Sequence, residues 1–191
     1  YNPSERMIFF PAKHESVPDS RPKIEYKRIM IYSRNEDGTF GDLTIETERL
    51  YSFGVSQNNS QETGKVTGYT FPICLWNRDG PTNAQTIWID KFNAIVENCK
   101  NHLLENREEI EMYDLTMQDL NKTREGRFNP LFWKHEKYKD ETNGKTGFRQ
   151  IPGRGPTLYA KLIVAKKNDK FITQFFNFNP DEEQERMEVI D

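Results

Sequence analysis

The residues that best suit a binding function by their type and spacing lie in a basic and aromatic segment, residues 122–170. The segment contains thirteen lysine and arginine residues and five acidic residues, so its net charge is +8. The net charge of the whole chain is −3, and the residues outside the segment therefore carry −11. Lysine and arginine attract a phosphate backbone, and exposed rings stack on unpaired bases. The segment therefore predicts a groove for single-stranded nucleic acid. The aromatic residues interleaved with its cations are Phe128, Phe132, Trp133, Tyr138, Phe148 and Tyr159.

A second interpretation of the same segment is purely structural. Aromatic rings often belong to a core, and most lysines are solvated on a surface without binding anything. The apolar residues Leu131 and Phe132 directly precede Trp133, which favours a core position for that ring. Both interpretations stay open at this stage.

The length and composition indicate one polar domain. The chain has 191 residues, of which 35% are hydrophobic and 30% charged. We expect a single domain over residues 1–180, with an N-terminal extension, followed by an acidic tail over residues 181–191. The apolar runs fall far short of the roughly 18 residues that a membrane-spanning helix needs, so no membrane partner is expected. The first residue is Tyr1, and the chain is therefore expected to begin inside a longer protein.

The two cysteines, Cys74 and Cys99, lack the spacing of a metal or redox motif. We expect both to be buried free thiols, because free cysteine behaves as a small apolar residue. This predicts a reducing, intracellular compartment.

Most of the chain has the alternation and turn signals of β-strands. Ser56–Gly68 and Thr142–Pro156 are polar and glycine-bearing, and we expect both to be loops. Pro72 lies inside an expected strand, which predicts an edge position or a bulge. A turn is expected at Asn35–Gly38, where Gly38 can take a positive φ. The expected strands span Ile24–Ser33, Asp42–Val55, Tyr69–Trp76, Asn129–Trp133, Thr157–Ala165 and Phe171–Phe178.

One long helix is expected at about Ala84–Glu109, with Thr82 or Asn83 as its N-cap. Its apolar residues recur at steps of three and four, and a short helical turn is expected at Leu115–Leu120. One helix among runs of strands predicts a mainly β (α+β) fold: an antiparallel β-barrel with a long inserted helix and extended loops. The apolar residues of the long helix are Ile89, Phe92, Ile95, Val96, Cys99, Leu103 and Leu104.

Three strings near the C-terminus carry a resemblance to a known family. They are FNPLFWK at residues 128–134, GPTLYAKLIV at residues 155–164 and ITQFF at residues 172–176. This block, about the last third of the chain, resembles the single-stranded DNA-binding proteins of nucleocytoplasmic large DNA viruses, which are built on an OB-type barrel. The long helix, with Trp88, Phe92 and Ile95, fits the same layout.

The resemblance implies sequence-independent binding of single-stranded DNA in viral DNA replication, recombination or repair, in a viral factory of the host cytoplasm or in the nucleus. It implies that Thr142–Gly155 closes as a clamp on the bound strand. The implied phosphate contacts are Lys134, Lys137, Lys139, Arg149, Arg154 and Lys161, and the implied stacking residues are Trp133, Tyr138, Phe148 and Tyr159.

The acidic tail, residues 181–191, has six acids and one arginine and ends in an apolar tip. The tail resembles those of replication single-stranded DNA-binding proteins, which implies that it competes with DNA for the basic groove and recruits replication proteins. The alternative is a solvated chain end. Self-association into a homo-oligomer is left open.

Enzymatic motifs are absent from the sequence, and we expect no catalytic activity, metal or cofactor. The three histidines lie far apart in sequence. Gly153–Pro156 lacks the G-K-[ST] ending of a phosphate-binding P-loop. Two other functions stay open. One is a protein-interaction or scaffold module, and the other is a metal-dependent nuclease built from dispersed carboxylates such as Asp42, Glu46 and Asp90.

Overall fold

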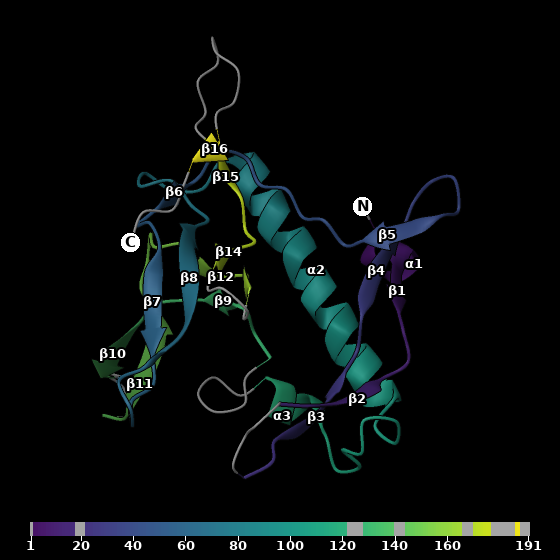
Figure 1. The fold of residues 1–191 in the computed structure, drawn as a ribbon. Coiled ribbons are helices and arrows are strands. Elements are labelled where there is room, and N and C mark those ends of the chain that lie inside the picture. The colour runs from purple at the N-terminus through teal and green to yellow at the C-terminus, as the bar shows by residue number, and fades with distance from the viewer. Residues whose placement is uncertain are drawn as a thin grey trace. The chain divides into compact units, whose positions relative to one another are not determined.

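The structure, a computed structural model, describes residues 2–17, 22–121, 128–139, 144–165, 170–176 and 186–187 (Figure 1). In this part the fold is mainly β, with antiparallel strand pairs and three helices, of which one is long. The chain divides into two compact units. Unit 1 comprises Tyr1–Arg49 and Pro81–Pro130, and unit 2 comprises Leu50–Gly80 and Leu131–Asp191. The single domain expected over residues 1–180 stays a prediction, because this division does not decide whether the units fold independently.

Unit 1 combines short strands with the long helix. One antiparallel sheet has the order β1-β4-β5, and β2 pairs with β3. Among its buried residues, Met7 clusters with Ile95 and Cys99, and Ile110 clusters with Leu115 and Leu120. The elements are α1 (Pro3–Arg6), β1 (Met7–Phe9), β2 (Lys13–Ser16), β3 (Glu25–Arg28), β4 (Ile31–Arg34), β5 (Phe40–Asp42), α2 (Asn83–Glu105) and α3 (Met117–Leu120).

Helix α2 confirms the predicted long helix and its Thr82 cap. The Thr82 hydroxyl accepts from the backbone N–H of Gln85, whose side chain accepts from the N–H of Thr82. The helix ends at Glu105, short of the predicted Glu109, because the Asn106 side chain donates to the His102 carbonyl (2.8 Å) and caps the end. The short helical turn expected at Leu115–Leu120 is also present, as α3.

Unit 2 is built on one larger sheet, called here the large sheet, with the order β6-β8-β12-β9 and with β7 also paired to β8. No sheet closes on itself among the described residues, so the structure shows the mainly β architecture without barrel closure. The strands are β6 (Tyr51–Ser52), β7 (Ser56–Asn59), β8 (Val66–Cys74), β9 (Leu131–Phe132), β10 (His135–Lys139), β11 (Thr146–Gln150), β12 (Thr157–Leu162), β13 (Val164–Ala165), β14 (Lys170–Phe171), β15 (Phe175–Phe176) and β16 (Arg186–Met187).

Both predicted loops contain strands. Ser56–Asn59 forms β7, and Thr146–Gln150 forms β11, which pairs along its length with β10. Sequence reasoning missed them because the residues of β7 and most residues of β11 are exposed, so neither strand has an apolar alternation. The clamp expected at Thr142–Gly155 is therefore a β-hairpin arm in its described part.

Two predicted strands are divided. Ile24–Ser33 forms β3 and β4, which pair with different partners, and Asp42–Val55 contributes only the end of β5 and the short β6. Pro72 lies within β8, which has neighbours on both sides, and not at an edge. Its missing N–H is accommodated because the break between β6 and β7 falls opposite Phe71 and Pro72.

Candidate nucleic-acid interface

The outer face of the large sheet presents aromatic rings to solvent. Residues directly opposite each other in an antiparallel pair point to the same face, and that face repeats every second residue. One row across the sheet runs from Tyr51 in β6 through Cys74 in β8 and Thr157 in β12 to Phe132 in β9. Tyr159 and Lys161 lie on the same face, two and four residues further along β12. Tyr51 is 65% exposed and Tyr159 51% exposed. The face therefore offers rings and one lysine on a rigid support.

The inner face of the same sheet is apolar and packed. Leu131 and Leu162 are buried there. Tyr69 contacts Phe171 with ring centroids 4.9 Å apart, and Phe71 contacts Phe175 at 6.2 Å. Because these contacts stabilise the sheet from one side, the rings on the outer face are not needed for the core.

A cavity of about 730 Å³ lies at the end of the large sheet, where β8 ends and β12 begins. It contains three cationic side chains, Arg78, Lys134 and Arg154, and no carboxylate. None of the three forms an ion pair with another described residue. We call this space the cationic cavity. It is also lined by Tyr51, Phe53, Cys74, Trp76, Asn77, Gly153, Gly155, Pro156 and Thr157.

Trp76 forms the wall of the cationic cavity by packing on Gly155. A Cβ atom at Gly155 would lie 2.5 Å from Trp76 Cβ, so only glycine leaves room for this contact. Trp133 packs against Trp76 edge to face, with ring centroids 5.7 Å apart and planes at 87°. The Trp76 Nε1–H is buried and has no hydrogen-bond partner among the described residues. Trp133 is half-buried, and its ring supports Trp76.

The hairpin of β10 and β11 carries five of the predicted contacts. Its register places Lys137, Lys139 and Phe148 on one face, and Tyr138 and Arg149 on the other. Phe148 is 60% exposed. Tyr138 and Arg149 each contact neighbouring side chains of the hairpin. Arg149 Nε donates to Glu136 Oε1 (2.8 Å), and its guanidinium carbon lies 5.5 Å from the Tyr138 ring centroid. A phosphate would therefore compete with Glu136 for Arg149.

The predicted site residues thus form three groups in unit 2. Lys134 and Arg154 lie in the cationic cavity, and Tyr159 and Lys161 lie on the outer face. Trp133 lies beside the cavity wall, and the remaining five lie on the hairpin. The aromatic residue Phe128 lies in unit 1, where it packs against the core, so its ring does not belong to this interface.

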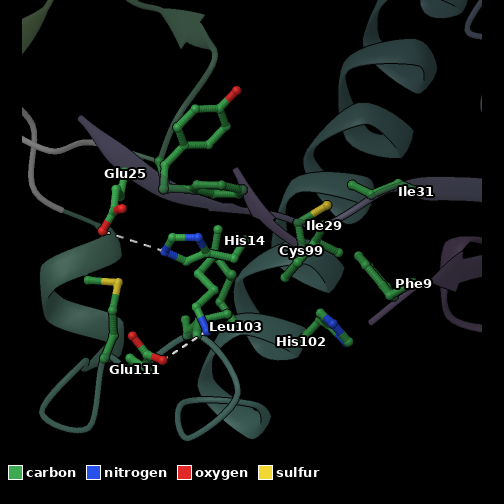
Figure 2. A pocket seen from close by; sticks show the side chains of 14 residues that line it. Phe9, His14, Glu25, Ile29, Ile31, Cys99, His102, Leu103 and Glu111 are labelled. Carbon is green, nitrogen blue, oxygen red and sulfur yellow. Dashed lines mark hydrogen bonds and ion pairs between the residues drawn. The ribbon is translucent and has the colours of Figure 1, made fainter. Parts of the chain in front are cut away.

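Unit 1 has a separate cavity of about 570 Å³ (Figure 2). Phe9, Ile31 and Cys99 line one part of it. Two side-chain pairs line another part: His14 Nε2 lies 3.8 Å from Glu25 Oε2, and Lys27 forms an ion pair with Glu111 (2.9 Å).

Two histidines that are far apart in sequence, His14 and His102, both line this unit 1 cavity. The His102 ring stacks on Phe9, with centroids 4.0 Å apart and planes at 8°. Burial lowers the pKa of His102, against the opposing effect of Glu109 and Glu105. The hydrogen bond from Lys27 lowers the pKa of Glu111. Both effects disfavour protonation of groups that line the cavity.

Three other findings bear on the expected sites. In the described ranges, no group of three or more His, Cys, Asp or Glu side chains is placed to hold a metal ion. No described helix is long and apolar enough to cross a membrane. Both cysteines are free thiols as expected; Cys99 is buried, which raises its pKa, whereas Cys74 is only half-buried.

Comparison with known proteins places the chain in a family. The family described as "Protein of unknown function (DUF2738)" matches residues 1–191. The chain belongs to this family. Among curated proteins it is similar to "Uncharacterized protein 007R" of Invertebrate iridescent virus 3, with 25% identity over 146 residues that cover 76% of this chain. The match spans only 27% of that viral protein's length. No solved structure matches the chain.

Sequence reasoning missed several residues of the interface in this DUF2738 protein. Tyr51, Phe53, Trp76 and Arg78 lie outside the basic segment at residues 122–170, and only strand pairing brings them to it. One signal was available. Arg78 follows the expected strand Tyr69–Trp76 in a turn, where a charged side chain is exposed next to a strand end.

Proposed function

We propose that the protein binds single-stranded DNA without sequence preference, along the outer face of the large sheet and into the cationic cavity. One observation carries the proposal: Tyr51, Phe132 and Tyr159 share an exposed sheet face that leads to three cations without a carboxylate among them. Rings on such a face stack on any base, and the cations neutralise phosphates. The proposed role is in viral DNA replication, recombination or repair.

The resemblance implies an OB-type domain over residues 1–180, and the proposal assigns its binding face to unit 2. The support for this assignment is the antiparallel sheet with one packed and one exposed aromatic face, and OB folds bind nucleic acid across such a face between loops. The hairpin of β10 and β11 is the arm that would close on the strand through Lys137, Lys139 and Phe148. The similar protein of Invertebrate iridescent virus 3 agrees with a viral setting.

The first test compares nucleic acids. Fluorescence anisotropy should be measured with labelled oligo-dT, a duplex of equal length and an RNA strand, each at two salt concentrations. We expect oligo-dT to bind more tightly than the duplex, because only unpaired bases expose faces for stacking. Its affinity should fall as salt rises, because counterion release weakens. Equal competition by the duplex would reduce the interface to a general basic patch. Absence of binding to all three would favour the protein-interaction function.

The second test removes one ring. Tyr159→Ala should weaken oligo-dT binding by about 1–3 kcal/mol, the usual contribution of one stacked base. The matched control is Tyr113→Ala, which removes a ring that is 67% exposed in unit 1. Thermal unfolding followed by circular dichroism should stay cooperative in Tyr159→Ala, because the Tyr159 ring lies outside the core and loses only its edge contact with Phe132. A lost cooperative transition would place Tyr159 in the core instead.

A further inference from the structure

We infer that the cationic cavity holds one nucleotide of the bound strand, a base together with its phosphate. The inference rests on the proposed function and specifies what its cavity recognises. The volume of about 730 Å³ lies within the usual range of small-molecule pockets, about 300–1,000 Å³.

The lining suits the two chemical parts of a nucleotide. Trp76, Tyr51 and Phe53 supply rings for the base; Phe53 is 73% exposed and contacts the Tyr51 ring edge to face, with centroids 5.2 Å apart. Arg78 and Arg154 supply guanidinium groups, which bind phosphate oxygens in pairs, and Lys134 supplies a point charge. No carboxylate lines the cavity, and none of these cations forms an ion pair with a described residue, so the cavity attracts an anion.

The cavity is continuous with the outer face of the large sheet. Tyr51, Cys74 and Thr157 form one row across β6, β8 and β12, and all three also line the cavity. A nucleic-acid strand stacked on Tyr159 would reach this row at Thr157, two residues away along β12. A nucleic-acid strand that follows this row therefore enters the cavity.

The test uses mononucleotides on the full chain. Isothermal titration calorimetry should be performed with dTMP, thymidine and inorganic phosphate. We expect dTMP to bind at least about tenfold more tightly than thymidine or phosphate alone, because only dTMP engages both the rings and the cations. Arg154→Ala should weaken dTMP binding at least about tenfold. The control, Arg34→Ala, removes an exposed arginine of unit 1 and should leave dTMP binding unchanged.

The outcomes separate the inference from the proposed function. If oligo-dT binds and dTMP does not, or if thymidine binds as tightly as dTMP, the inference is wrong and the proposed function stands. If dTMP binds and oligo-dT does not, the cavity is a mononucleotide site and the proposed function is wrong. Equal losses in Arg154→Ala and Arg34→Ala would place dTMP elsewhere. The thermal unfolding of Arg154→Ala must match the unaltered protein, since Arg154 forms no ion pair with a described residue.

Discussion

The contact between Trp76 and Gly155 shapes the cationic cavity through a single missing methyl group. An added Cβ at Gly155 would approach both Cβ and Cγ of Trp76 at 2.5 Å or less. Trp76 Cβ is tied to the backbone and cannot swing away, so the chain on one side must shift. The wall of the cavity therefore depends on glycine at this position.

Gly155→Ala should lower the free energy of unfolding by about 1–3 kcal/mol, the usual cost of inserting a carbon into a packed site. Urea unfolding followed by tryptophan fluorescence measures it. The control is Gly68→Ala in β8, where a Cβ would have no atom within 4 Å. If the two variants were equally stable, Trp76 would not be packed on Gly155 and the cavity wall would be differently built.

At the scale of elements, α2 begins with two reciprocal hydrogen bonds. Thr82 Oγ1 accepts from Gln85 N and Gln85 Oε1 accepts from Thr82 N, each at 3.1 Å. These bonds satisfy donors that the first turn of a helix leaves free. The Thr82 hydroxyl also donates to Glu48 Oε1 (3.3 Å) and so links the helix start to the chain before β6.

Thr82→Ala should lower the free energy of unfolding by about 0.5–2 kcal/mol, because the cap hydroxyl is lost. Thr82→Ser keeps the hydroxyl and should recover most of that loss. Urea unfolding compares the two variants. The affinity for oligo-dT should not change in either variant, since Thr82 belongs to unit 1 and the proposed interface to unit 2. A loss in Thr82→Ser as large as in Thr82→Ala would show that the methyl group matters and the cap does not.

At the scale of the whole molecule, charge is divided along the chain. The segment at residues 122–170 carries +8 and the acidic tail carries six acids against one arginine. Of the tail, the structure describes only Arg186–Met187, which pairs with β15 as strand β16. Truncation after Pro180 would therefore remove a strand as well as charge. Neutral substitutions outside β16 test the tail's charge alone.

Replacing Asp181 by Asn and Glu182, Glu183 and Glu185 by Gln should tighten oligo-dT binding at low salt, because the tail then competes less for the cations. The gain should disappear near 0.1–0.15 M salt if the tail acts at more than about 10 Å. Anisotropy at three salt concentrations measures it.

The control for this experiment makes the same charge change with exposed acids of unit 1. It replaces Glu5 and Glu36 by Gln and Asp90 and Asp114 by Asn. A tail variant that binds no better than this control would leave the tail as a docking segment for partners or a solvated chain end.

Contiguous residues were enough to predict helix α2, its Thr82 cap and the turn between β4 and β5. Each depends on hydrogen bonds or periodicities within a few residues; Asn35 N, for example, donates to Thr39 O (2.7 Å) around Gly38, which has a φ of 85°. Basic and aromatic composition likewise predicted the segment that contains Lys134 and Arg154. These features are local, so neighbouring residues encode them.

Tertiary structure decided what the local pattern could not. Arg78 reaches Lys134 and Arg154 only because β8 pairs with β12 across a long loop, and the sequence has no local signal for that register. The same pairing leaves Tyr159 on the outer face and Leu158 on the inner face. Arg149, expected to be a free phosphate contact, is paired with Glu136 on the facing strand. The register between distant strands depends on how the side chains of both strands pack on the two faces of the sheet. The residues of one strand alone therefore do not determine it.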